Sequence, residues 1–267
     1  MKKELHWIYK MALFLAMGIV FLALFAPWIA PYDPTAVSTE EILEGMSSSH
    51  WLGTDALGRD ILSRTIYGAR TSVAFAFVAA FCTMVLGLML GILSGYFGGW
   101  VDRGIQCLVA VFQGLPGMSL MIAIAAILPE NNFRLIIALT LTSWAGFSRI
   151  VRSEVIRIRR ELYMESIKSL GASHGYIVRK YVLPNVLPVV IVLLTLRIGT
   201  SLLSASALSY LGLGVSPPTA DWGVMISDAR TYFRSYPLMM IAPGTGITLF
   251  CLSINLLGDA MRERIRR

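Results

Sequence analysis

The 267-residue sequence has little charge and little cysteine. Asp, Glu, Lys and Arg make up only 15% of the residues, whereas hydrophobic residues make up 56%. A soluble domain has about 25% charged residues, so the composition argues against a soluble enzyme and against a disordered chain. The three cysteines, Cys82, Cys107 and Cys251, lie in apolar stretches without a CxxC pair. This pattern predicts buried thiols and indicates neither a disulfide framework nor a metal site.

The sequence also lacks the GxxxxGK[ST] pattern that cradles nucleotide phosphates. Any ATP and Mg²⁺ that drive the protein would therefore be held by a separate subunit, and we expect this chain to bind no cofactor. Residues 171–175 read GASHG, which formally matches the GxSxG nucleophile elbow of hydrolases. That elbow requires a buried strand before it, whereas a helical pattern precedes this stretch. We therefore expect no catalytic residue and no enzyme activity.

Long uncharged runs are what the sequence has in abundance. A transmembrane helix needs about 20 mostly apolar residues, and six runs qualify or come close. They predict an all-α, polytopic membrane bundle of six transmembrane helices. Lys2 and Lys3 before the first run would also suit a signal peptide, although the run is long for a cleaved segment. The runs are residues 11–30, 71–101, 104–129, 135–148, 181–220 (in which only Arg197 is charged) and 235–258.

The basic residues are distributed unevenly between alternating loops. With a cytoplasmic N-terminus, the inner segments carry 16 Lys and Arg and the outer segments carry 6. The positive-inside rule then places both termini in the cytoplasm and explains the net charge of +7 without nucleic acid. We divide the chain into residues 1–70, a first transmembrane helix with an extracytoplasmic segment, and residues 71–267, a core membrane domain with a cytoplasmic loop at 149–184.

Gly87, Gly91, Gly95 and Gly99 are spaced by four in the second run. This spacing puts them on one helix face, where a neighbouring backbone can approach closely. We interpret the face chiefly as ordinary helix packing. A tight interface in a moving transporter is the alternative.

Residues 149–184 combine most of the basic charge with a helical pattern. Val151, Val155, Ile158 and Leu162 recur at helical spacing. Gly171 follows, and a second short periodic run leads to the next span. The pattern predicts a helix, a turn and a helix, with an apolar face that needs a partner.

The spacing inside this loop resembles the EAA loop of ABC importer permeases. That pattern runs E-A-A, three residues, G, nine residues, I, one residue, L-P, and the spacing is met in full here. The departures are Ser166 and Ile167 for the alanines and Tyr181 for isoleucine. In that family the loop is a coupling helix that docks in a cleft of the cytoplasmic ATPase. The resemblance assigns ATPase coupling to Glu165, Ser166, Ile167, Gly171, Ala172, Ser173, Tyr181, Leu183 and Pro184.

Three further stretches are similar to the second permease subunit of the peptide/nickel family. They are HWLGTDALGRDILSRTIYGAR at 50–70, LSYLGLGVSPPTADWGVMISDAR at 208–230, and the C-terminal NLLGDAMRERIRR. The resemblance implies a type I ABC importer permease fold in the inner membrane of a prokaryote. It also implies three kinds of protein partner: a second homologous permease, two cytoplasmic ABC ATPases and an extracytoplasmic substrate-binding protein.

The cargo that this resemblance implies is nickel, carried as a chelate, or a di- or oligopeptide. Peptide permeases of the family often have an acidic residue just before the stretch that reads LSYLG here. Residues 204–207 read SASA, without a carboxylate. The absence of a carboxylate in this stretch favours nickel as the cargo.

The outer segments resemble those that meet the binding protein and line the gate. Interfacial anchoring is the alternative, because Ile61, Leu62, Ile66 and Ala69 suggest a short amphipathic surface helix. A second helix is expected after Asp221, which would serve as its cap. The candidate contacts are Asp55, Arg59, Asp60, Asp221, Trp222 and Asp228.

Arg197 is the one charge deep inside a predicted span. Such a charge is costly in lipid and usually faces the bundle interior or water. It either lines the translocation path or pairs with a backbone carbonyl or an acid of the sister subunit.

A stand-alone secondary carrier or channel is the alternative function. Internal repeats, broken helices or clustered intramembrane acids would be expected of it, and the sequence shows none of these signals. We therefore predict a non-catalytic permease subunit that forms half of the path of an ATP-driven importer.

Overall fold

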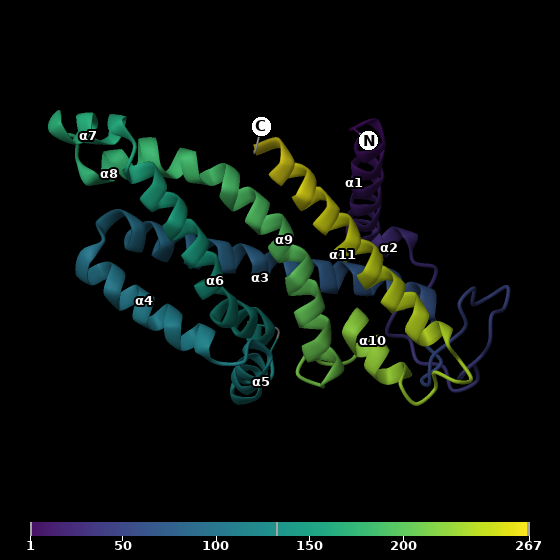
Figure 1. The fold of residues 1–267 in the computed structure, drawn as a ribbon. Helices are drawn as coiled ribbons and strands as arrows, with labels where there is room; N and C mark the ends of the chain where they lie inside the picture. The colour runs from purple at the N-terminus through teal and green to yellow at the C-terminus, as the bar shows by residue number, and fades with distance from the viewer. Residues whose placement is uncertain (1, 132, 266–267) are drawn as a thin grey trace.

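A computed structural model describes residues 2–131 and 133–265, and helices dominate it (Figure 1). The all-α fold class predicted from the sequence is confirmed. The helices are α1 (Lys2–Leu24), α2 (Ala26–Ile29), α3 (Ile61–Phe97), α4 (Gly99–Gly114), α5 (Gly117–Ile127), α6 (Phe133–Arg159), α7 (Leu162–Ser169), α8 (His174–Ile177), the π-helix η1 (Val178–Val182), α9 (Leu183–Tyr210), α10 (Trp222–Ala229) and α11 (Leu238–Ile265).

Within the described residues, five helical stretches are long and apolar enough to cross a membrane. They lie in α1, α3, α6, the continuous run α8–η1–α9, and α11. The third predicted span, residues 104–129, is not one straight helix. It consists of α4 and α5, which bend by 94° at their junction and would bring the number of spans to six if they count as one.

The bend between α4 and α5 has a local cause. Proline disfavours helical backbone in the residue before it, and Leu115, which precedes Pro116, has an extended backbone at φ −94° and ψ 143°. The prediction of one continuous helix over residues 104–129 is therefore wrong. A single proline in an otherwise apolar run of normal length does not predict whether the helix kinks or ends there.

Helix α3 has 37 residues and begins at Ile61. The carboxylate of Asp60 caps it by accepting a hydrogen bond of 2.7 Å from the backbone N–H of Ser63. The surface helix predicted around residues 61–69 is therefore not a separate element but the first turns of α3, and residue 70 lies inside this helix. At 1.5 Å per residue α3 is about 55 Å long, so it extends well beyond a bilayer core about 30 Å thick.

The glycine stripe packs α3 against α6. A Cβ atom placed on Gly91 would lie 2.6 Å from the Cβ of Val151, and one placed on Gly87 or Gly95 would lie 2.8 Å from the nearest atom of α6. The interpretation as close helix packing is thus supported at these three positions. Gly99 differs, because it lies at the start of α4 with φ +54° and no heavy atom within 4 Å of an added Cβ.

The cysteine prediction is only partly right. Cys251 is buried, Cys82 is half-buried and Cys107 is exposed on α4. Apolar sequence context predicts insertion into a membrane but does not distinguish the side of a helix that faces protein from the side that faces outward.

Of the apolar clusters among the described residues, the two largest lie toward opposite ends of α3. The first joins α1, α3, α9, α10 and α11 around Trp222 and Phe250. The second joins α3, α6, α7, α8 and α9 around Val151, Val155 and Met164. Each cluster supports one of the two candidate functional regions described below.

The α3–α6 contact gives a first testable prediction. Gly91→Ala should destabilise the protein by about 1–3 kcal/mol, because the added methyl group overpacks against Val151 and the carbonyl of Ser148. Gly104→Ala is the matched control, since an added Cβ at Gly104 meets no heavy atom within 4 Å. Thermal unfolding of both variants in one detergent measures the difference. Equal melting temperatures for the two variants would contradict tight packing of α3 against α6, the contact called the seam below.

Candidate functional site

Segment 149–184 folds as a helix, a turn and a helix, as predicted. Helix α7 ends at Ser169, and Gly171 has φ +77°, a left-handed backbone that favours glycine. The N–H of Gly171 donates to the carbonyl of Lys168 at 3.0 Å, and the N–H of Ala172 donates to that of Ile167 at 3.4 Å. These two bonds form a Schellman motif, which explains the glycine in physical terms.

The turn is followed at once by α8. The hydroxyl of Ser173 accepts a hydrogen bond of 3.4 Å from the N–H of Tyr176 and so caps this short helix. Helix α7, not a strand, precedes the turn. The resemblance of residues 171–175 to a nucleophile elbow is therefore only formal, as expected.

Two buried side chains fasten the segment to the membrane helices. Met164 of α7 and Ile177 of α8 are both fully buried, in the cluster that α3, α6 and α9 complete. The hydroxyl of Tyr96 on α3 also hydrogen-bonds to Nδ1 of His174 at 3.0 Å. Met164 does not follow the predicted stripe through Leu162, because the chain leaves the helix between Arg159 and Leu162 and the periodicity restarts.

The opposite side of the segment is apolar but uncovered. Leu162 and Leu170 have 83% and 86% of their surface exposed. Such exposure is unusual for leucine in an ordered turn–helix unit, and contiguous apolar exposure marks an interaction surface. The pair, with the half-exposed rings of Tyr163 and Tyr176, is called the leucine patch below.

The EAA-like residues lie in the same stretch of chain as these side chains. Glu165 and Ser166 are exposed on α7, whereas Ile167 and Ala172 are half-buried around the turn. Tyr181 lies between the rings of Tyr163 and Tyr176, with centroid distances of 6.4 and 6.0 Å. The structure therefore brings the pattern together as one continuous unit.

Leu183 and Pro184 stand where α9 begins, after one turn of π-helix. The N–H of Leu183 donates to the carbonyl of Val178, five residues earlier. Proline inside a continuous helix removes one N–H donor, and wider π turns commonly occur where a helix is interrupted at a functional place. The segment thus continues into α9 without a loop, so a movement of α8 would be transmitted to a membrane span.

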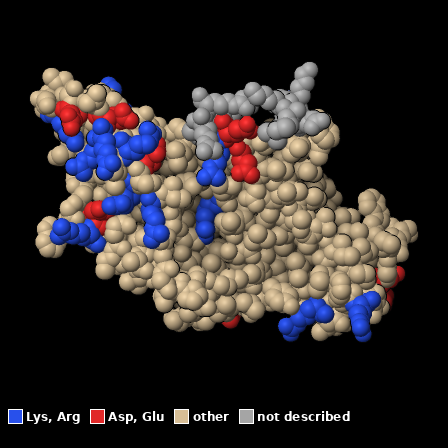
Figure 2. Space-filling model, in the orientation of Figure 1, with Lys and Arg blue, Asp and Glu red and all other residues tan. Residues whose placement is uncertain are grey.

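Figure 1 places α7, α8 and both described chain ends on the same, upper side of the molecule. Lys and Arg side chains gather over α7, α8 and the adjoining end of α6 (Figure 2). The uneven charge inferred from the sequence is therefore also uneven in space.

The outer candidates form a largely buried charge network within the chain. Arg59 donates through Nε to Asp55 at 2.7 Å and lies 3.5 Å from Asp228 of α10. Arg64 lies 3.4 Å from Asp55 and donates to the carbonyl of Pro34 at 2.9 Å. Burial raises the pKa of Asp228, and Arg59 and Arg64 lower it in part. Asp228 is the only exposed residue among the six candidates.

The other three candidates hold elements together. Asp60 caps α3, and Asp221 caps α10 by accepting from the N–H groups of Gly223 and Val224, as predicted. The second oxygen of Asp221 accepts from the hydroxyl of Ser72 at 2.7 Å. The buried ring of Trp222 donates from Nε1 to the carbonyl of Thr65 at 2.9 Å. These contacts give the three residues structural roles within the chain.

Arg197 of α9 donates to the hydroxyl of Ser143 on α6, and its Nε has no hydrogen-bond partner within the described residues. Within the described residues the guanidinium therefore contacts a side-chain hydroxyl, and a role in the path or a partner in the sister subunit stays a prediction. An arginine that keeps an unused donor inside a bundle can still donate a hydrogen bond to an anionic ligand.

The sequence belongs among characterised membrane transport components. Residues 87–267 match the family described as "Binding-protein-dependent transport system inner membrane component". The glutathione transport system permease protein GsiD of Escherichia coli O6:K15:H31 is 40% identical over 261 residues, which cover 97% of this chain and 86% of GsiD. The dipeptide transport system permease protein DppC of Alkalihalophilus pseudofirmus is 37% identical over 253 residues, or 95% of this chain and 83% of DppC.

The fold has a counterpart among solved structures. The inward-facing MetNI methionine ABC transporter contains a chain that superposes with a TM-score of 0.61 at 18% sequence identity. The match covers 78% of the present chain and 98% of that chain. It confirms the ABC importer permease fold.

The charge network generates the second prediction. Asp55→Asn should destabilise the protein by about 3–5 kcal/mol, because it leaves Arg59 and Arg64 without their shared buried carboxylate. Asparagine keeps the acceptor oxygen for the backbone N–H groups, so the loss isolates the charge. Asp33→Asn, at an exposed carboxylate, is the control. If both variants unfold at the same temperature, the network does not stabilise the chain.

Proposed function

Since the chain belongs to the family of binding-protein-dependent transport system inner membrane components, we propose that it couples ATP hydrolysis by partner subunits to import through segment 149–184. It is a multi-pass inner membrane permease subunit of an ABC importer and is not catalytic. Family membership favours a subunit of a larger complex over a stand-alone carrier or channel. The complex that we propose contains a second homologous permease, two ABC ATPases and an extracytoplasmic binding protein.

The single observation that carries the coupling proposal is the two-sided character of segment 149–184. Met164 and Ile177 bury one side in the bundle, whereas Leu162 and Leu170 leave the other side apolar and uncovered. An apolar side chain that enters a pocket of a partner typically contributes much of the binding energy of an interface. The ATPase is the occupant that the EAA-like spacing implies. On this reading both termini face the cytoplasm, and the charge distribution of Figure 2 supports that orientation.

The mechanism follows from how the segment is attached. When ATP draws the two ATPases together, α7 moves with the surface that it contacts. Its buried anchors and the unbroken run from α8 to α9 then carry the motion into the spans. Import requires that ATP and the loaded binding protein favour the same state of the permease pair.

We propose small peptides, including glutathione-like tripeptides, as the cargo. The two relatives described above are named for glutathione and dipeptide transport. Neither name supports nickel as the cargo, which the absence of a carboxylate at residues 204–207 favours. Such peptides carry carboxylates at neutral pH, and the unused Nε of Arg197 suits a carboxylate.

The leucine patch gives the third prediction. Leu170→Asp should abolish co-purification with the ATPases and ATP-dependent uptake, because it places a charge in the proposed apolar contact. The chain itself should fold normally, since Leu170 is almost fully exposed. Val37→Asp introduces the same charge at another exposed apolar residue, in the loop before α3, and should leave ATPase binding intact. Retention of the ATPases by the Leu170 variant would refute the coupling role.

The path gives the fourth prediction. In vesicles that contain the complete importer, Arg197→Gln should reduce uptake of dipeptides and glutathione at least tenfold, mainly through a raised KM, with the assembled complex unchanged. Thr200→Ala, at an exposed hydroxyl one turn along α9, is the matched control. Uptake of a nickel chelate is measured in parallel. Transport of the chelate but not of the peptides would overturn the proposed cargo.

A further inference from the structure

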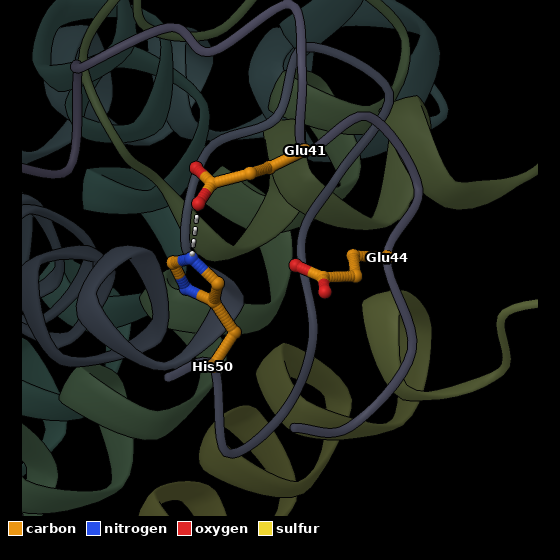
Figure 3. A group of neighbouring side chains, drawn as sticks. All are labelled: Glu41, Glu44 and His50. Carbon is orange, nitrogen blue, oxygen red and sulfur yellow. Dashed lines mark ion pairs between the residues drawn. The ribbon is translucent and has the colours of Figure 1, made fainter. Parts of the chain in front are cut away.

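We infer that the loop between α2 and α3 binds one divalent transition-metal ion through Glu41, Glu44 and His50. A carboxylate oxygen from each glutamate and a ring nitrogen of the histidine all lie within 4.8 Å of one another. Figure 3 shows the imidazole and the two carboxylates directed toward one shared space. The loop lies on the side of the molecule away from α7 and α8 (Figure 1), so this site is separate from the proposed coupling surface.

The imidazole is oriented as it is in many metal sites. His50 is only 4% exposed, and its Nδ1 lies 2.9 Å from the buried carboxylate of Asp60. Metal-binding histidines commonly donate their second ring N–H to a carboxylate, which fixes the tautomer and leaves the other nitrogen as the ligand. Here Asp60 leaves Nε2 directed at the glutamates.

The spacing suits an ion better than a direct contact. Nε2 of His50 is 3.6 Å from Oε1 of Glu41, which is longer than a hydrogen bond. Two ligands of a tetrahedral zinc ion, each about 2.1 Å from the metal, are about 3.4 Å apart. The separation of His50 and Glu41 therefore needs little adjustment to hold an ion.

The charge also favours a cation. Glu41 and Glu44 converge without a Lys or Arg partner in any ion pair of the described residues. Two neighbouring carboxylates repel each other, and a divalent ion would relieve this. One imidazole with two carboxylates is a ligand set for Zn²⁺ and its neighbours such as Ni²⁺, rather than for Mg²⁺ or Ca²⁺, which prefer oxygen alone.

One buried side chain holds the backbone of both glutamates. The hydroxyl of Thr54 donates to the carbonyl of Glu41 and accepts from the N–H of Glu44 at 2.8 Å. The N–H of Gly53 donates to the carbonyl of His50 at 3.0 Å. The backbone positions of the three residues are thereby held before an ion binds, which lowers the cost of assembling a site.

The test uses Zn²⁺ and the full-length chain in lipid nanodiscs, with any affinity tag removed. Equilibrium dialysis followed by elemental analysis should give one tightly bound Zn²⁺ per chain, not displaced by excess Mg²⁺. Glu44→Gln should weaken binding about tenfold or more. This variant is preferred to one at His50, because the exposed Glu44 side chain makes no described intrachain contact and its loss should not affect folding.

Glu40→Gln is the matched control, an exposed acid in the same loop that lies outside the cluster. It should bind Zn²⁺ as the natural chain does. Zn²⁺ should also raise the melting temperature of the natural chain and of the Glu40 variant more than that of the Glu44 variant. Undiminished binding by Glu44→Gln, equal losses in both variants, or no bound Zn²⁺ at micromolar concentration would each overturn the site.

Discussion

The close approach of α3 and α6 is the contact on which the rest of the structure depends. Gly87, Gly91 and Gly95 remove the side chains that would hold these two helices apart. In a bilayer, where lipid is as apolar as leucine, such backbone proximity is what favours helix association. Because α6 leads directly to α7, this seam also determines where segment 149–184 lies. The proposed surface for an ATPase thus depends on the packing of α3 against α6.

Helix α3 connects the two functional regions mechanically. At its far end Tyr96 contacts His174 of segment 149–184. At its beginning the capping residue Asp60 contacts His50 of the preceding loop, and the carbonyl of Thr65 accepts from Trp222. A helix is stiff along its axis, so a displacement at one end need not be absorbed on the way. The same element therefore connects segment 149–184, the proposed ATPase contact, with the loop before α3. The contacts of Tyr96 with His174 and of Thr65 with Trp222 form this connection.

The sequence predicted what is encoded locally and missed what depends on tertiary contacts. Long apolar runs predicted the spans, the spacing of the glycines predicted the seam, and Gly171 and Asp221 predicted a turn and a cap. Each of these follows from a few neighbouring residues. The stop at Pro116 was missed, because proline kinks some membrane helices and ends others.

The remaining misses concern which side of an element is buried. Met164, not Leu162, anchors α7, since two irregular residues before it shift the helical phase. Asp55 and Arg59 were expected at a surface, yet they neutralise each other inside the chain. Residues 41, 44 and 50 are separated in a polar loop without periodicity, so only the folded backbone around Thr54 brings them together. Spacing rules for metal ligands describe regular elements, so they do not predict a site in such a loop.

Asp60 links the loop before α3 to the first turn of that helix. One of its oxygens binds the N–H of Ser63 at the start of α3, and the other binds His50. An ion on His50 would therefore hold the loop to the first turn of the helix that reaches the coupling segment. The ion pair of Arg59 with Asp228 ties α10 to the same loop. The loop, α10 and the start of α3 are thus expected to move as one body during transport. The charge network and the proposed metal site would hold this body together.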